Sequence, residues 1–227
     1  MWRRFVVSVG GSVIVDRGIN VLWVHRLARL LDSFFEEGYR FAVVTGGGRT
    51  ARQYAEAVRV LGGSKTLQDQ AGILATKMNA WVMISALKHA YHEPLDDIWK
   101  AASLMRTHIP VLYGSIPGVT SDYGGALLAE ATSSVFLNIT NVDGIYTADP
   151  SVNPDARLIE RMDHPSLISL ISTIDTREPG AHTPIDLAAA KILARSRIPT
   201  IVVGPDIENI RRVLEGKRFR GTKIVSQ

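Results

Sequence analysis

The chain has 227 residues, of which 46% are hydrophobic and 21% charged, and this composition is ordinary for a soluble globular protein. The apolar runs fall short of the roughly 18 residues that a membrane span needs, and the absence of cysteine excludes disulfides and thiolate metal sites. The net charge of +4 comes from scattered basic residues, so we expect no nucleic acid and no membrane as partners, and a cytoplasmic location.

The first half of the sequence alternates apolar runs typical of buried strands with stretches of helical periodicity. Each of the two strand-like runs is followed directly by glycines. Gly38 follows the first long helical stretch, and glycine is common directly after the C-terminus of a helix. The predicted elements are strands at 5–9 and 41–45 and helices at 21–37, 50–61 and 66–88.

The second half continues the same alternation, with Asp122 as the expected N-cap of its second helix. The basic residues around Arg220 are interpreted as a solvated helix end and tail. An alternation of strands and helices implies a mainly parallel sheet covered on both faces. We therefore predict an α/β fold, a three-layer α/β/α sandwich forming a single domain over residues 1–227. The predicted elements are helices at 96–106, 122–132, 185–196 and 206–214 and strands at 109–113, 135–140, 200–203 and 222–225.

Four of the predicted strands end in polar loops that contain glycine. In open α/β sheets, ligands bind beyond the carboxyl ends of the strands. Glycines let backbone N–H groups approach an anion closely, and the N-terminus of the following helix adds to the attraction. One such loop is often only a tight turn, but four of them suggest that the site holds more than one phosphate. The loops are residues 10–12, 46–48, 114–122 and 140–144.

Several enzyme classes are excluded because their motifs are missing from the sequence. There is no Gly-x-x-x-x-Gly-Lys-Ser/Thr run of a P-loop NTPase and no Gly-x-Gly-x-x-Gly after the first strand. The protein-kinase motifs and the Gly-x-Ser-x-Gly elbow of serine hydrolases are also absent. The six histidines show no metal-ligand spacing, so we predict no built-in metal site.

The sequence does carry motifs of a known family. The segment 140–150, Thr-Asn-Val-Asp-Gly-Ile-Tyr-Thr-Ala-Asp-Pro, and the glycine loop 44–52 both resemble signatures of the amino-acid kinase superfamily. Within it, the chain looks most like archaeal-type UMP kinases. Further matching pieces, in the family's order, are 10–13, Asp69 with 72–73, 117–122, 126–130 and 185–191.

The resemblance implies a fold and an activity. Members of this kind transfer the γ-phosphoryl group of ATP to the phosphate of UMP, which makes UDP for pyrimidine nucleotide biosynthesis. The acceptor is already anionic, so catalysis is expected to consist of positioning and charge stabilisation, with Mg²⁺ bridging the ATP phosphates. The family also implies a homohexamer built as a trimer of dimers, and the helices at 21–37 and 66–88 could supply subunit contacts.

On the ATP side, the resemblance assigns phosphate contacts to the first two glycine loops. It assigns nucleotide contacts to the segment that begins with the fourth loop. Arg52 and Asp143 are the expected catalytic residues. Arg52 would put a forked positive charge on phosphate, and its position just after three glycines favours this role over that of a solvent-facing helix residue. Asp143 would orient positive groups around the phosphoryl, although Asp-Gly is also a common turn pair. The implied ATP-binding residues are Gly11, Ser12, Gly48, Arg52, Thr140, Tyr146 and Asp149.

On the UMP side, the resemblance points to Asp69 as an acceptor for ribose hydroxyls, with helix capping as the alternative role. The loop after the third predicted strand would supply hydroxyl and N–H groups to the uracil and the phosphate, unless it is a plain surface loop. The implied UMP-binding residues are Gly47, Asp69, Ser115, Ile116, Pro117, Gly118, Val119, Thr120 and Ser121.

Two departures from the superfamily pattern stand out. Ser8 occupies the first-strand position where many members have lysine, which leaves the source of positive charge open, and residues 180–183 match no motif. Two rival functions remain at this point. An isopentenyl phosphate kinase would carry a histidine by its second glycine loop, which residues 46–49 lack. A nucleotide- or oxyanion-binding storage protein could use the same scaffold without catalysis.

Overall fold

The computed structural model describes the chain except residues 1, 149, 151, 173–184 and 227. Its elements in chain order are β1 (Arg4–Val9), α1 (Gly11–Ile14), α2 (Val21–Glu36), β2 (Arg40–Thr45), α3 (Gly48–Val60), α4 (Lys65–Ala86), α5 (Ile98–Leu104), β3 (Val111–Tyr113), α6 (Ser121–Thr132), β4 (Val135–Ile139), β5 (Arg161–Met162), α7 (His164–Ser172), α8 (Leu187–Arg195), β6 (Thr200–Val203), α9 (Ile207–Leu214) and β7 (Thr222–Ile224).

The strands of the described residues form one sheet in the order β3-β2-β1-β4-β6-β7-β5. The pairs from β3 to β6 are all parallel, whereas β7 runs antiparallel to β6. The register places Ser8 of β1 between Val44 of β2 and Asn138 of β4. The order brings the four strands with glycine-bearing loops together as neighbours, so those loops share one edge of the sheet.

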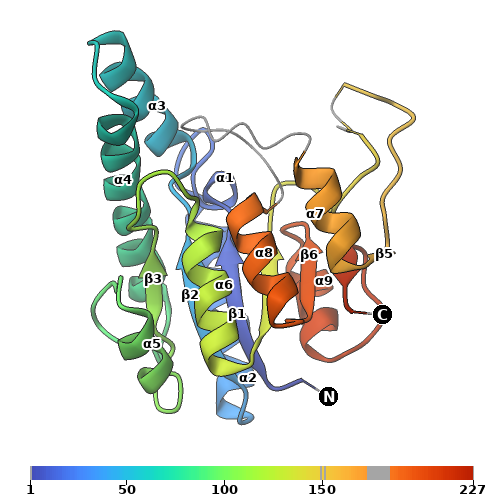
Figure 1. Ribbon diagram of the computed structural model, residues 1–227. Coiled ribbons are helices and arrows are strands. Elements are labelled where there is room, and N and C mark those ends of the chain that lie inside the picture. The colour runs from blue at the N-terminus through green and yellow to red at the C-terminus, as the bar shows by residue number, and fades with distance from the viewer. Residues whose placement is uncertain (1, 149, 151, 173–184, 227) are drawn as a thin grey trace.

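Helices cover both faces of the sheet, as the ribbon shows (Figure 1). Side chains alternate along β1: Phe5, Val7 and Val9 join a buried cluster with α2, α4 and α9, whereas Val6 joins a second cluster with α5, α6, α7 and α8. This alternation follows from the two-residue period of a strand. The predicted three-layer α/β/α architecture is confirmed.

The helix starts follow local capping chemistry, and one of the predicted caps is wrong. Asp122 is not the cap of α6. Thr120 holds that position, and its Oγ1 accepts a hydrogen bond from the N–H of Asp122 at 3.2 Å. Asp122 lies in the first turn, where its carboxylate is free to bond elsewhere. Short α1, β5 and α7 were not predicted from the sequence.

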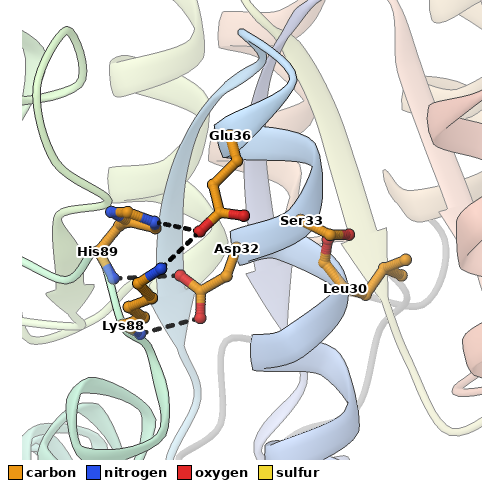
Figure 2. Close-up of polar contacts among 6 residues, drawn as sticks. All are labelled: Leu30, Asp32, Ser33, Glu36, Lys88 and His89. Atoms are coloured by element: carbon orange, nitrogen blue, oxygen red, sulfur yellow. Dashed lines mark hydrogen bonds and ion pairs between the residues drawn. The ribbon is translucent and has the colours of Figure 1, made fainter.

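A polar cluster fixes α2 against the chain that leaves α4 (Figure 2). The buried carboxylate of Asp32 accepts N–H bonds from Lys88 at 2.9 Å and from His89 at 3.1 Å. Exposed Glu36 binds the side chains of the same two residues, and these hydrogen bonds, that of Lys88 first, lower its pKa to about 2. Asp32 thus satisfies backbone donors just beyond the end of α4.

The helices of the described residues include none whose length and apolar character would suit a membrane crossing.

Candidate active site

The four predicted loops meet at the carboxyl edge of the sheet because β3, β2, β1 and β4 are parallel neighbours. The first two are in direct contact. A Cβ atom built on Gly11 would lie 1.9 Å from the nitrogen of Gly48, and one on Gly48 would lie 2.3 Å from the carbonyl oxygen of Gly11. Gly48 also has φ of +64°, a conformation that suits glycine. Only glycine at both positions lets the two backbones approach in this way.

Arg52 joins this glycine contact from one turn inside α3. Its half-buried guanidinium reaches across to α1, with Nη1 3.4 Å from the hydroxyl oxygen of Ser12. The structure therefore brings together Gly11, Ser12, Gly48 and Arg52, the four residues predicted for the ATP phosphates. Gly48 is the first residue of α3, and the positive end of that helix dipole favours an anion in the same region.

Gly47 faces away from the contact between Gly11 and Gly48, toward α4. A Cβ atom at this position would lie 2.4 Å from Cβ of Ala51 and 3.2 Å from the carbonyl oxygen of Gly72. Thr76, one turn further along α4, donates a hydrogen bond to the carbonyl oxygen of Gly114 at 3.1 Å. The second glycine loop thus sits between the phosphate region and the surface where α4 meets the loop after β3.

Asp69 lies on that surface and contacts the predicted UMP loop. Its Oδ2 accepts a hydrogen bond from the N–H of Gly118 at 2.8 Å. The alternative role of helix cap is wrong, because Ser64 caps α4. A cavity lies against this loop and is lined by residues of the loop, Ile116 and Thr120 among them, and by Leu112 of β3.

A polar cluster lies under the start of α6 and was not predicted from the sequence. Buried Ser8 donates to Oδ1 of Asp122 at 2.5 Å, and Asn138 of β4 donates to Oδ2 at 3.5 Å. Thr120 donates to Oδ2 of buried Asp186 at 2.5 Å, while Oδ1 of Asp186 caps α8. Ser8 therefore serves the carboxylate of Asp122, and the loop is tied to α8 beside it.

Burial, together with the nearby carboxylate of Asp186, raises the pKa of Asp122 to about 7 against the lowering effect of the hydrogen bonds from Ser8 and Asn138. The ordinary value is 3.8, so the folded protein holds a proton that the unfolded chain releases as the pH rises. This contribution to stability is fully present below the unfolded pKa and is lost as the pH rises toward the folded one.

We therefore expect Asp122→Asn to gain stability relative to wild type as the pH rises from about 5 to about 8, by about 1–3 kcal/mol. Thermal unfolding at both pH values, at equal protein concentration, measures the difference. Asp155→Asn, which changes an exposed carboxylate, is the matched control and should show no such trend. A constant gap between Asp122→Asn and wild type across this range would contradict the expectation.

The fourth loop, after β4, carries the residues predicted for the nucleotide side. The N–H of Thr140 donates to the carbonyl oxygen of Val203 at 2.9 Å, which joins the loop to the end of β6. Asp143 pairs with Arg220 at 2.6 Å between Oδ2 and Nε. Hydrogen bonds to Asp143 and then to Tyr146 raise the pKa of Arg220.

Arg220 also lies at this edge, a position that was not predicted from the sequence. Its side chain is exposed, as expected for a solvated tail, but it also binds two predicted site residues. Asp149 lies outside the described residues, as do residues 180–183. Across the part of the chain that the structure describes, no group of three or more His, Cys, Asp or Glu side chains could hold a metal.

Comparisons with known proteins place this geometry in a family. Residues 3–204 match the amino acid kinase family. The uridylate kinase of Pyrococcus abyssi is 38% identical over 225 residues, which covers 97% of this chain and 99% of that protein.

Solved structures agree with these sequence matches. The crystal structure of uridylate kinase from Archaeoglobus fulgidus has a TM-score of 0.85 at 37% identity and covers 97% of this chain and 99% of its own. UMP kinase from Bacillus anthracis shares the fold, with a TM-score of 0.79 at 21% identity, over 100% of this chain and 97% of its own. Sequence and fold together show that the chain belongs to the amino acid kinase family.

Proposed function

We propose that this protein transfers the γ-phosphoryl group of MgATP to the phosphate of UMP and so makes UDP for pyrimidine nucleotide biosynthesis. The observation that carries the proposal is the near full-length similarity to archaeal proteins named uridylate kinase, at 36–40% identity. The edge of the sheet where four loops meet supports the proposal, because an enzyme that transfers a phosphoryl group between two nucleotides needs several phosphate contacts close together.

The proposed mechanism is direct transfer between two phosphates held in line. The acceptor is an anion, so no strong base has to remove a proton from it. Gly11, Ser12 and Gly48 would cradle the ATP phosphates with N–H groups, and Arg52 would stabilise the charge on the transferring group. Magnesium would arrive on ATP, held by the phosphates and by several waters, which it keeps because it dehydrates reluctantly.

The two nucleotides would lie on either side of this phosphate region. On the acceptor side we assign Gly47, Asp69 and residues 115–121, since Asp69 and Gly118 are in contact. On the donor side we assign Thr140, Tyr146 and Asp149, with Tyr146 beside the adenine and Asp143 orienting positive charge. The pairing of Asp143 with Arg220 supports that last role.

Neither rival function gains support from the molecule. Residues 46–49 contain no histidine that would receive the phosphate of isopentenyl phosphate, and the heavy atoms nearest to a Cβ atom built on Gly47 belong to Ala51, Gly72 and Thr76. A storage protein has no need of a separate acceptor loop tied to Asp69.

A coupled assay of ADP release tests the proposal with UMP, CMP, isopentenyl phosphate and no acceptor. We expect rapid turnover with UMP and much slower turnover with CMP. Uracil and cytosine present opposite donor and acceptor groups, and a mismatch leaves buried groups unpaired. Turnover of isopentenyl phosphate without turnover of UMP would overturn the assignment.

Replacement of Asp69 by alanine should weaken UMP use selectively. The change removes a charged acceptor for the ribose and also releases the N–H of Gly118 from its contact at 2.8 Å. A loss of about 1.5–3 kcal/mol raises KM for UMP by about 10- to 100-fold and leaves KM for ATP nearly unchanged. Steady-state kinetics with each substrate varied in turn measures both values.

The matched control is Gln70→Ala, which changes the next, exposed residue of α4. Its KM for UMP should stay within about twofold of wild type. If Asp69→Ala also left this constant unchanged, the acceptor assignment would be wrong.

We also propose that the protein is a homo-oligomer, and that the trimer of dimers implied by the resemblance is its form. Of the two helices predicted for subunit contacts, α2 packs one face into the core and exposes Val21 and Leu22 at its start, whereas α4 presents a row of exposed apolar side chains. An apolar row of this kind is typical of a protein interface. Light scattering of a stable monomer would contradict the proposal. The row consists of Leu67, Leu74, Met78 and Trp81, which are 47–63% exposed.

A cytoplasmic location and a single domain over residues 1–227 complete the proposal. The single domain is supported by the sheet, in which all seven strands of the described residues are joined.

A further inference from the structure

Arg220 reaches the nucleotide edge because of the direction of the last strand. Strand β7 is antiparallel to β6, with Val202 opposite Thr222. The amino end of β7 therefore lies where the parallel strands have their carboxyl ends. Arg220, two residues before β7, comes to the same edge as the loop after β4.

The backbone of Arg220 is held from both sides by one side chain. Its N–H donates to Oδ1 of Asn209 at 2.8 Å, and its carbonyl oxygen accepts from Nδ2 of Asn209 at 2.7 Å. Asn209 lies on α9, whose inner face is buried in the core. The residue is thus fixed to a rigid element although its side chain is exposed.

The guanidinium of Arg220 binds two residues of the loop after β4. Nε contacts Asp143 at 2.6 Å, and the side chain also hydrogen-bonds Tyr146. The loop is also anchored by the first residue of β7, since Oγ1 of Thr222 accepts a hydrogen bond from the N–H of Ile145 at 2.8 Å. An isolated exposed ion pair contributes little, but a fixed arginine with two partners in one loop restricts that loop.

We propose that Arg220 is a positioning residue of the donor-nucleotide site: it holds the loop 140–147 in the shape that presents Tyr146 to the adenine of ATP. This inference rests on the proposed function, which places ATP at that loop. A residue that orders the donor loop affects ATP affinity and leaves UMP affinity unchanged, because Asp69 and residues 115–121 lie on the other side of the phosphate region.

Calorimetric titration with a non-hydrolysable ATP analogue and, separately, with UMP tests the proposal on the whole protein. The variants are Arg220→Ala, Arg220→Lys, Asp143→Asn and the double change of Arg220→Ala with Asp143→Asn. Arg218→Ala is the matched control, an exposed arginine two residues earlier. The melting temperature of each variant is measured alongside.

We expect Arg220→Ala to weaken binding of the ATP analogue by about three- to tenfold and to leave UMP binding within about twofold. Arg220→Lys should recover only part, because lysine cannot bond Asp143 and Tyr146 as a fork does. The double variant should be little worse than the worse single variant, since the two residues act as one unit.

Equal weakening by Arg218→Ala, unchanged affinity for the ATP analogue, or a parallel loss for UMP would each overturn the positioning role. These binding measurements do not depend on turnover. A wild-type protein that binds the ATP analogue but does not phosphorylate UMP would overturn the proposed function alone, and the titrations would still decide the role of Arg220.

Discussion

Alanine in place of Gly48 is expected to abolish nucleotide use. The new Cβ would lie 2.3 Å from the carbonyl oxygen of Gly11 and 2.8 Å from that of Val15, so the first glycine loop would have to move away. The backbone of Gly48, at φ of +64°, adds a penalty of about 1–2 kcal/mol for any residue with a side chain. A shift of about 1 Å in the phosphate loops costs about 100-fold in turnover or more.

Gly62→Ala separates the backbone penalty from the steric clash. Gly62 has φ of +83° at the end of α3, but nothing lies within 4 Å of a Cβ atom placed there. This control should lose stability to a similar extent through its backbone and keep full turnover. Kinetics and thermal unfolding of both variants make the comparison. Near wild-type turnover in Gly48→Ala would show that the glycine contact does not shape the site.

The sequence made the phosphate region predictable because its signal is local. Buried strands such as β1 and β2 read as apolar runs, and the glycines that follow them mark the positions where backbones must approach closely. Once these strands are parallel neighbours, their loops share an edge. The contact between Gly11 and Gly48 and that between Arg52 and Ser12 follow from this arrangement.

The contacts that were missed depend on strand order and direction, which local patterns do not contain. Ser8 and Asp122 are 114 residues apart, and their hydrogen bond exists because β1 lies under the start of α6. The direction of β7 cannot be predicted from the sequence either, since a short apolar run has the same pattern in a parallel and an antiparallel strand. This direction places Arg220 beside Asp143. Strand β5 has only two residues and gives no periodic signal.

The position of Ser8 also bears on the missing lysine of the first strand. The hydroxyl of Ser8 is buried and committed to Asp122, so it offers nothing to a phosphate. Arg52 is the basic side chain that the described structure places against the first glycine loop, through Ser12. We therefore expect Arg52 to carry much of the charge stabilisation that lysine provides in other members.

Arg52→Ala is accordingly expected to lower turnover by about 100- to 1000-fold, the usual loss when one donor to developing charge is removed. Arg52→Lys should recover only part of the rate, because a single ammonium cannot contact two phosphate oxygens as the guanidinium does. Arg59→Ala, which removes an exposed arginine paired with Glu56 at the far end of α3, should leave turnover unchanged. Single-turnover kinetics at saturating ATP and UMP measures the chemical step apart from binding. Ser8→Ala completes the set, and its turnover should change little because its hydroxyl serves only the buried carboxylate. If Ser8→Ala abolished turnover while Arg52→Ala stayed near wild type, the charge would have to come from a different group.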